Sequence, residues 1–514
     1  MTTEQILIMI AIACYLIVMV GIGLYCSRKT SDVGDFYLGG RKLGPVVTAM
    51  SAEASDMSSW LLMGLPGVAY LSGVADATWT AIGLAIGTYV NWLIVAKRIR
   101  IYSHEANNSI TLPDFFSRRY RDEKNVLMAI AAIMIIIFFI PYTASGFAAC
   151  GKLFSSLFGV DYQVAMIISA VVIVGYTATG GFLAASTTDL IQSIVMSIAL
   201  VVVVVFGVNV AGGLDAVIEN AAALPGYLSL GSSYDPTTNT AVSYAGITVI
   251  SGLAWGLGYL GMPHILLRFM AIEDSNKLHI SRRIATIWVV ISMSVAVFIG
   301  IVGYSMTKVG ALPVLEGTNS ETIIIQISNL LSTHGAFLAI LAGIILAGIL
   351  AATMSTADSQ LLSASSSVSE NLVRSFFKIS LTEKQAMTVA RVSVIVISLI
   401  AAFIARDSNS SVFGIVSFAW AGFGGTFAPV VIMALFWKRS NKQGALAGML
   451  VGGTTVFIWK YLVKPLGGIF GVYELLPAFV LGIIAIVIVS KLTPAPSKEI
   501  TDEFEHVQQL CKTK

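Results

Sequence analysis

The sequence predicts an all-α integral membrane protein that crosses the bilayer thirteen times. Of its 514 residues, 56% are hydrophobic and only 11% are charged, and the mean hydropathy is +0.84. A soluble domain carries about 25% charged residues, so the composition excludes an ordinary soluble protein. Apolar runs of roughly 20 residues, the length that spans a hydrocarbon core, recur along the chain. Two of these runs are interrupted by glycine, proline and polar residues, a pattern typical of transporters.

The predicted spans start close to Met1. The first is long enough to cross the membrane and a charged loop follows it, so we expect a membrane helix there and not a cleaved signal peptide. The fourth and ninth are longer than needed, which predicts tilted or protruding helices. The predicted spans are 5–26, 45–72, 76–97, 125–154, 161–180, 188–212, 243–268, 283–306, 334–370, 385–405, 411–437, 443–462 and 472–491.

Loop charges predict the orientation. Loop 97–124 carries seven lysines and arginines, whereas loop 213–242, on the opposite side, contains Asp215, Glu219 and Asp235 and no basic residue. The other basic loops fall on the side of loop 97–124; they contain Arg28, Lys29, Arg282, Arg283, Lys438, Arg439 and Lys442. The positive-inside rule therefore predicts a plasma-membrane protein with its N-terminus outside and its C-terminus in the cytoplasm. The net charge of +3 is spread along these loops, so no basic face suggests nucleic-acid binding.

Two further segments are not expected to span. Residues 320–332 predict a short amphipathic helix lying on the outer surface. The tail from Pro494 is polar, and we expect it to be partly disordered.

The two interrupted runs are the second and seventh spans. The second contains Gly64-Leu-Pro66-Gly67, and the seventh crowds four glycines and Pro263 into 252–263. Membrane helices are rich in glycine, so either break alone has an ordinary explanation. Because the breaks lie five spans apart, they predict two inverted repeats of five helices. The expected division is 1–44 (first span and cytoplasmic loop), 45–212 (repeat one), 213–242 (extracellular loop), 243–437 (repeat two), 438–493 (spans 12 and 13) and 494–514 (cytoplasmic tail).

The ninth span offers oxygen atoms to a cation. Ala352, Ser355 and Thr356 are spaced i, i+3 and i+4, so they share one helical face. Hydroxyl and carbonyl oxygens are the ligands that hard cations select. The alternative is that these hydroxyls only bond to the carbonyl four residues earlier or to a neighbouring helix.

Acidic residues within the spans are the other chemical signal. Asp56 lies in the interrupted second span, where an ionised carboxylate costs several kcal/mol unless it faces a partner, water or an ion. Glu53 lies three residues before it and has no assigned role. Asp189 stands near a helix end, so a plain interfacial position is an equal alternative, and Asp358 has no assigned role either.

Aromatic residues follow the second break. Trp255, Tyr259 and Pro263 are spaced i, i+4 and i+8 and could line an apolar pocket with a few polar groups. Ordinary bundle packing explains the same spacing.

Long motifs identify the chain as resembling the bacterial sodium/proline symporters of the sodium/solute symporter family. These motifs are L-G-G-R-K-L-G-P, S-D-M-S-S-W-L-L-M-G-L-P-G, T-L-P-D-F-F, G-G-F-L-A, W-G-L-G-Y-L-G-M-P-H-I-L-L-R-F-M, M-S-T-A-D-S-Q-L-L and S-F-A-W-A-G-F-G. The resemblance covers nearly the whole chain and implies a LeuT-type fold of five plus five inverted helices, with discontinuous helices 2 and 7.

The same resemblance implies roles for individual residues. Sodium would be held by carbonyls of Ala54, Met57 and Ala352 and by hydroxyls of Ser355 and Thr356, with Asp56 needed for sodium-coupled binding and Asp189 on the inward cation route. Proline would contact Tyr142, Trp255, Tyr259 and Pro263, with Ser58 close by and Gln360 near the cytoplasmic exit, and Arg41 would act in coupling. The chain departs from the family's S-D-M-S-G-W at Ser59, and Glu53 stands where some relatives have a small residue.

The expected function is therefore sodium-coupled secondary active uptake of L-proline by alternating access. Na⁺ and L-proline are the expected ligands within a lipid bilayer, without an organic cofactor, a nucleic acid or an obligate protein partner. A symporter for another small solute, a channel and an intramembrane enzyme are the alternatives. Paired broken helices favour alternating access over a channel, and the sequence contains no nucleophile–base or metal constellation that favours an enzyme.

Overall fold

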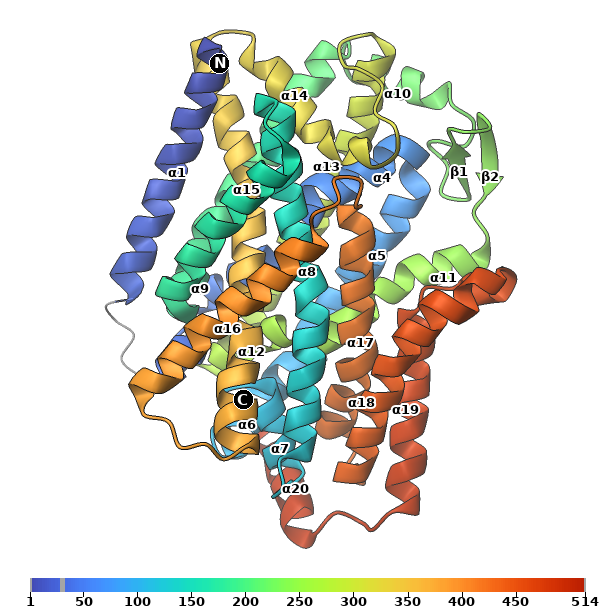
Figure 1. The fold of residues 1–514 in the computed structure, drawn as a ribbon. Helices are drawn as coiled ribbons and strands as arrows, with labels where there is room; N and C mark the ends of the chain where they lie inside the picture. The colour runs from blue at the N-terminus through green and yellow to red at the C-terminus, as the bar shows by residue number, and fades with distance from the viewer. Residues whose placement is uncertain (1, 28–32, 513–514) are drawn as a thin grey trace.

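The computed structural model describes residues 2–27 and 33–512 and is almost entirely helical, as the composition predicts. Its elements pack side by side as an elongated bundle (Figure 1). The α-helices are α1 (Thr3–Ser27), α2 (Val33–Leu38), α3 (Pro45–Ser59), α4 (Leu65–Ser72), α5 (Val74–Val90), α6 (Ala96–Glu105), α7 (Leu112–Arg119), α8 (Val126–Phe158), α9 (Tyr162–Val210), α10 (Leu214–Ala222), α11 (Gly246–Ala254), α12 (Pro263–Ala271), α13 (Leu278–Lys308), α14 (Ile323–Ser332), α15 (Ala336–Ser366), α16 (Glu383–Ile404), α17 (Val412–Phe436), α18 (Lys442–Ile458), α19 (Leu475–Leu492) and α20 (Lys498–Lys512).

Shorter elements complete the chain. The π-helical turns are η2 (Trp60–Gly64), η3 (Asn91–Val95), η7 (Ser367–Phe376) and η8 (Trp459–Val463). The 3₁₀ turns are η1 (Gly39–Arg41), η4 (Trp255–Gly261), η5 (Ser275–Lys277), η6 (Gly317–Thr322), η9 (Lys464–Leu466) and η10 (Gly468–Gly471). One antiparallel hairpin, β1 (Ser232–Asp235) with β2 (Thr240–Ser243), lies in the loop predicted to be extracellular.

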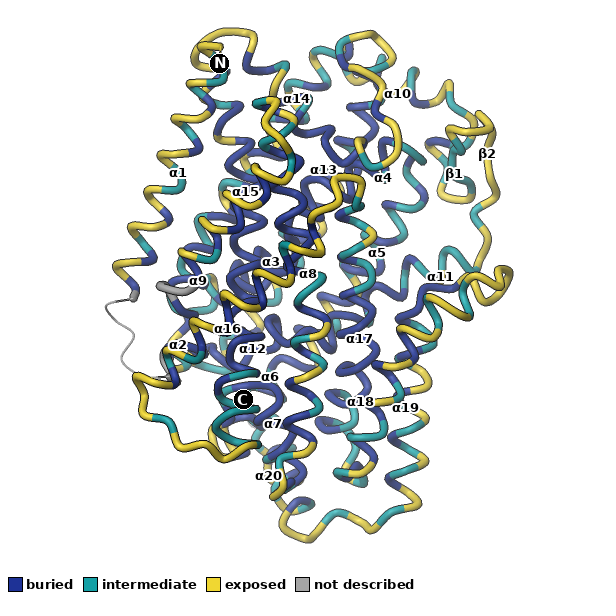
Figure 2. The backbone as a smooth tube through the Cα atoms, viewed as in Figure 1, coloured by how far each residue is buried: buried dark blue, intermediate teal, exposed yellow. Residues whose placement is uncertain are grey.

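The burial pattern is that of a membrane bundle. The interior of the bundle is buried, while α1, α16 and α19 at its periphery turn exposed faces outward (Figure 2). These faces are apolar: Ile17, Leu399 and Leu492 are 71%, 66% and 81% exposed. Apolar surface of this kind is stable against lipid and not against water.

Ten helices of the described chain are long and apolar enough to span, or eleven if one bent pair counts as a span. The predicted spans 161–180 and 188–212 both correspond to α9, which leaves helical geometry at Gly181 (φ 68°). The predicted span 45–72 is divided among α3, η2 and α4. The number thirteen stays a prediction.

The interruption of the second predicted span lies earlier than the Gly64-Leu-Pro66-Gly67 motif. The backbone leaves helical geometry at Ser58 (φ 51°, ψ −172°), and its hydroxyl accepts a hydrogen bond from the Trp60 N–H at 3.0 Å. Pro66 stands in the first turn of α4, where its missing N–H costs nothing. The wide turn η2 joins the two helices.

The seventh predicted span changes direction where its glycines and proline stand. The segment Gly246–Gly261 meets α12 at an angle of 48°. Its last two turns form η4, and the extended backbone of Met262 (ψ 110°) precedes Pro263 at the start of α12.

Two smaller expectations were wrong. Residues 323–332 form the short helix α14 near the end of the bundle that holds the N-terminus (Figure 1), but it does not lie on the surface, since Ile323 and Ile327 are fully buried. Its apolar face is too wide for a surface helix, since Ile324 and Ile325 are also buried. The tail is a helix, α20, whose Ile500, Phe504 and Val507 side chains are buried, because these apolar residues repeat at helical spacing.

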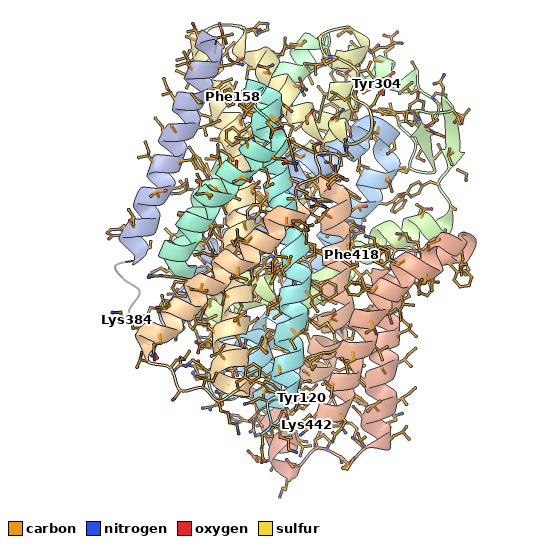
Figure 3. The ribbon with its side chains drawn as sticks, viewed as in Figure 1. Tyr120, Phe158, Tyr304, Lys384, Phe418 and Lys442 are labelled. Atoms are coloured by element: carbon orange, nitrogen blue, oxygen red, sulfur yellow. The ribbon has the colours of Figure 1, made fainter. Side chains whose placement is uncertain are left out.

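The basic loops meet at one end of the bundle. Tyr120 and Lys442 lie at the end opposite Phe158 and Tyr304 (Figure 3), and Tyr120 bonds to Ser440 across two of the basic loops. The predicted basic pair Arg28 and Lys29 lies outside the described residues.

Candidate cation and substrate site

Helix α3 carries a row of polar side chains through the centre of the bundle. Ser51, Glu53, Ser55 and Asp56 are each at most 5% exposed. The helix packs against α9, α12, α13 and α15. Polar groups buried this deeply need hydrogen-bond partners or ions.

Asp189 connects α3 to the ninth predicted span. One carboxylate oxygen accepts from Ser355 at 2.5 Å, and the other accepts from Ser51 at 2.6 Å. Asp189 is completely buried and stands inside α9, so the interfacial alternative for this residue was wrong.

Arg268 supplies the positive charge near Asp189. Its Nη2 lies 3.4 Å from the Asp189 carboxylate, and its Nε donates to Ser51 at 3.0 Å. It also donates to Ser359 at 2.5 Å and to the His264 carbonyl at 2.9 Å. Sequence reasoning missed Arg268, although a buried arginine within an apolar segment is itself a signal of this kind.

The predicted sodium ligands lie on facing helices. Ala54 and Met57 on α3, and Ala352, Ser355 and Thr356 on α15, are all buried, and the two helices are in contact. The Ser355 hydroxyl is bonded to Asp189, and the Thr356 hydroxyl is buried without a hydrogen-bond partner among the described residues.

Asp56, also on α3, contacts η4 and α8. Its Oδ2 accepts from the Tyr259 hydroxyl at 2.5 Å, and its backbone carbonyl accepts from the Tyr142 hydroxyl at 3.1 Å. Thus η4 and α8 both contact α3 at the residue where the sequence predicts a functional carboxylate.

A narrow cavity with a free volume of only about 10 Å³, smaller than a proline molecule, lies beside this contact. It is lined by Asp56, Met57, Trp60, Leu84, Tyr142, Trp255, Val416 and Trp420. Four of these are predicted site residues, and Trp60, Leu84, Val416 and Trp420 were missed. Trp60 and Trp420 stand inside the motifs S-D-M-S-S-W and S-F-A-W, so their sequence signal was present.

Aromatic rings close the cavity on one side. Trp255 lies 5.7 Å from Trp60 and 5.3 Å from Phe413 between ring centroids, and Tyr473 stacks on it at 5.3 Å. The Trp420 indole N–H donates to the Trp255 carbonyl at 2.7 Å. These contacts fix the cavity wall in an apolar, aromatic setting.

A buried ion pair holds Phe413 in place. Lys152 lies 2.7 Å from Glu321, whose carboxylate also accepts from the backbone N–H groups of Val412 and Phe413 at 3.1 and 3.0 Å. Glu321 therefore caps α17, and this carboxylate was not identified from the sequence.

The remaining predicted residues do not line the cavity. Ser58 lies beside Tyr142, and Pro263 begins α12 after the bend; neither lines the cavity. Gln360 accepts from Thr143 at 3.1 Å. Asp358 accepts from Thr177.

Arg41 is separate from this site and lies at the end with the basic loops. Its guanidinium donates to the Met270 carbonyl at the C-terminal end of α12 (2.6 Å) and to the Ser109 carbonyl (2.8 Å). Burial, and secondarily the nearby Arg100, lower the pKa of Arg41 to about 10, so it stays charged at neutral pH.

The sequence profile of the sodium:solute symporter family matches residues 36–452. The chain belongs to this family. It is 41% identical to the osmoregulated proline transporter OpuE of Bacillus subtilis over 507 residues, covering 99% of both chains. It is also 41% identical to a sodium/proline symporter of Haemophilus influenzae, covering 98% of both, and 42% identical to the high-affinity proline transporter PutP of Bacillus subtilis, covering 95% and 99%. As a member of a symporter family, the chain is a multi-span membrane transporter and not an enzyme.

Solved structures share its architecture. A Na⁺-coupled sialic acid symporter superposes with a TM-score of 0.77 at 18% identity, covering 96% of this chain and 99% of that one. The transporter Mhp1, in a closed conformation, gives 0.56 at 17% identity, covering 92% and 98%. MhsT gives 0.54 at 14% identity, covering 87% and 98%. The fold is therefore the LeuT-type fold of transporters, as predicted.

Proposed function

We propose that this protein couples the inward movement of Na⁺ to the uptake of L-proline by alternating access. The observation that carries the proposal is the junction of two sets of groups on α3: oxygens facing α15 on one side and an aromatic cavity at Asp56 on the other. The names of the relatives, which are about 40% identical over nearly their full length, support proline as the solute.

Sodium is proposed to bind between α3 and α15. The carbonyls of Ala54, Met57 and Ala352 and the hydroxyls of Ser355 and Thr356 are its ligands. The unpartnered Thr356 hydroxyl supports this assignment, because a buried hydroxyl without a partner is costly. Asp189 accepts a hydrogen bond from the Ser355 hydroxyl, which orients the Ser355 oxygen lone pairs away from the carboxylate. Asp189 is the proposed next contact on the inward route.

Proline is proposed to bind at the position of the narrow cavity between Asp56 and Trp255, whose walls must move apart to admit it. Its ring would pack on Trp255, Tyr142 and Tyr259, next to the chain reversal at Pro263. Ser58 stabilises the bend after Met57 through its hydrogen bond with the Trp60 N–H, and Gln360 lies toward the inner exit. Arg41 is proposed to transmit movement of α12 to the basic loops, because it bonds to the last turn of that helix.

The proposed orientation places the basic end of the bundle in the cytoplasm. The end with Tyr120 and Lys442 is then inside, together with α20, and the N-terminus is outside (Figure 3). The proposed repeats are 45–212 and 243–437. Each begins with an interrupted helix, at Ser58 and at η4 respectively.

The free energy of sodium entry is sufficient for accumulation. Moving one charge through ~100 mV contributes ~2.3 kcal/mol, and a tenfold sodium gradient adds ~1.4 kcal/mol. Because proline is a zwitterion, one sodium ion carries the net charge. Together these terms sustain a proline gradient of roughly 500-fold.

Sodium-dependent proline binding tests the proposal. Purified protein should bind radiolabelled proline saturably in NaCl and at least tenfold more weakly in KCl. Ser355→Ala should reduce the sodium dependence. The control Ser398→Ala removes a buried hydroxyl on α16 that has no hydrogen-bond partner among the described residues, and it should behave like wild type. Binding that is equally strong in KCl would reject the coupling, and displacement by another solute in preference to proline would favour a symporter for that solute.

A further inference from the structure

The side chain of Arg268 fixes α12 to the helices around it. Arg268 stands in the last turn of α12, which follows the bend at Met262, and it is 1% exposed. Its Nε donates to Ser51 on α3 at 3.0 Å, and its Nη2 donates to Ser359 on α15 at 2.5 Å. Because the guanidinium is planar and rigid, both bonds depend on one position of this group. Movement of the guanidinium therefore breaks both bonds together.

The contact of Arg268 with Asp189 is the longest of its polar contacts. Nη2 lies 3.4 Å from the Asp189 carboxylate, whereas charge-assisted N–H···O bonds are usually about 2.7–2.9 Å long. Asp189 is bound more closely by two hydroxyls, those of Ser51 at 2.6 Å and Ser355 at 2.5 Å. In the described part of the chain, Asp189 is the one acidic side chain within ion-pair distance of Arg268. The carboxylate that balances the charge of Arg268 is therefore held mainly by serines.

Arg268 also lies between the proposed sodium ligands and the basic end of the bundle. The Met270 carbonyl, two residues further along α12, accepts a hydrogen bond from Arg41 at that end. On the other side, the Ser355 hydroxyl is a proposed sodium ligand and donates to Asp189. Under the proposed orientation, an ion that moves inward from Ser355 therefore meets the Asp189 carboxylate and the guanidinium beside it.

We propose that Arg268 competes with sodium for Asp189, and that displacement of its guanidinium by the incoming ion releases α12. Two cations at one buried carboxylate repel each other strongly, because charges interact strongly where water is excluded. A sodium ion that reaches Asp189 displaces the guanidinium, and the bonds to Ser51 and Ser359 are lost with it. The inner half of the seventh predicted span is then free to move. The inference rests on the proposed function, since it uses the proposed sodium ligands and the proposed inward route.

Equilibrium binding of ²²Na⁺ to the purified protein, without proline, tests this role. Arg268→Gln removes the competing charge and leaves the Asp189 carboxylate available, so its half-saturating sodium concentration should fall tenfold or more below that of the wild type. Loss of a residue with a purely structural role would leave sodium affinity unchanged or weaken it. Arg268→Lys restores the positive charge and should cancel most of the gain in affinity.

Arg119 provides the matched control. It is fully buried, its Nε donates to the Ala434 carbonyl at 3.1 Å, and it makes no ion pair with a described residue. Arg119→Gln therefore also removes a buried guanidinium, but one that does not neutralise a carboxylate. Its half-saturating sodium concentration should stay within threefold of the wild-type value. A tenfold gain in this control as well would overturn the specific role of Arg268.

A second variant decides the question if Arg268→Gln does not fold. Ser359→Ala removes the shortest hydrogen bond of the guanidinium and leaves Asp189 and the proposed sodium ligands in place. Sodium then displaces Arg268 more easily, and sodium affinity should rise threefold or more. Saturable binding to the wild type without tighter binding to either variant would overturn the role of Arg268 and leave the proposed function intact. A wild type without saturable ²²Na⁺ binding would reject the proposed function and this inference with it.

Discussion

The Tyr259 hydroxyl donates a hydrogen bond to the Asp56 carboxylate at 2.5 Å, across the contact between η4 and α3. The two residues are 203 positions apart, and each stands close to an interruption in its helix. A ligand that contacts either residue therefore acts on both interrupted segments. This bond connects the cation-binding groups to the aromatic cavity.

Removal of the hydroxyl at Tyr259 should weaken sodium binding. Tyr259→Phe leaves the buried Asp56 carboxylate with no donor, and hydrogen bonds to charged groups contribute about 1.5–3 kcal/mol. We expect the half-saturating sodium concentration for proline uptake to rise tenfold or more. Tyr227→Phe is the matched control, because Tyr227 is equally buried and its hydroxyl bonds to the Tyr70 carbonyl. An unchanged sodium requirement in Tyr259→Phe would show that this bond has no role in coupling.

Trp255 should matter more for proline than for sodium. The indole forms a wall of the cavity and packs on Trp60 and Phe413. Truncation of a large aromatic side chain at the centre of a binding site costs about 2–4 kcal/mol, so Trp255→Ala should raise the proline KM by at least 30-fold. The sodium dependence should change by less than threefold. Trp459→Ala, at a peripheral tryptophan packed on Phe470, is the control, and a larger effect on sodium than on proline would place the substrate elsewhere.

Loss of the buried ion pair between Asp189 and Arg268 should lower the thermal stability of the protein. Asp189→Asn leaves the Arg268 guanidinium, which is 1% exposed, without its counter-charge. Loss of one partner of a buried pair costs about 3–5 kcal/mol, so thermal unfolding in detergent should begin at a distinctly lower temperature.

A double substitution distinguishes the loss of this ion pair from a general loss of stability. Asp189→Asn with Arg268→Gln should be less destabilised than the sum of the two single variants, since the pair is then removed as a unit. The exposed Asp215→Asn should unfold like wild type. Strictly additive losses would mean that the two side chains are energetically independent.

Glu321 should stabilise the end of the bundle around Phe413. Glu321→Ala removes the partner of the buried Lys152 and the acceptor for the N-terminus of α17. We expect a loss of about 3–5 kcal/mol in stability and faster dissociation of bound proline, because Phe413 packs on Trp60 and Trp255. Glu316→Ala, an exposed glutamate just before the same turn, is the control. Normal stability and proline dissociation in Glu321→Ala would exclude this role.

The sequence predicted the class of fold because apolar length and loop charge are local properties. The position of the first interruption was not predictable in this way. Gly64 and Pro66 carry the usual signals for a break, yet the backbone turns at Ser58, whose positive φ is stabilised by contacts with Trp60 and the packed helices around it. A serine in that conformation has no sequence signature.

The candidate site was predictable only where a single residue stands out from its neighbours in the sequence. Asp56 stands out as a carboxylate inside an apolar run, and its identification needed no structure. The partners of Asp189 did not stand out, because Ser51, Arg268 and Ser355 come from three distant segments and meet only in the folded bundle. Glu53 was visible in the sequence, but its hydrogen-bond partner Trp92 comes from a distant segment and was not identified.

Sodium-driven proline uptake into proteoliposomes tests the central claim most directly. An inward sodium gradient should drive radiolabelled proline to an internal concentration well above the external one, and replacement of sodium by potassium should abolish this accumulation. Asp56→Asn should show no sodium-dependent uptake in the same assay. Equal proline uptake with and without the sodium gradient, or normal sodium-dependent uptake by Asp56→Asn, would contradict the account.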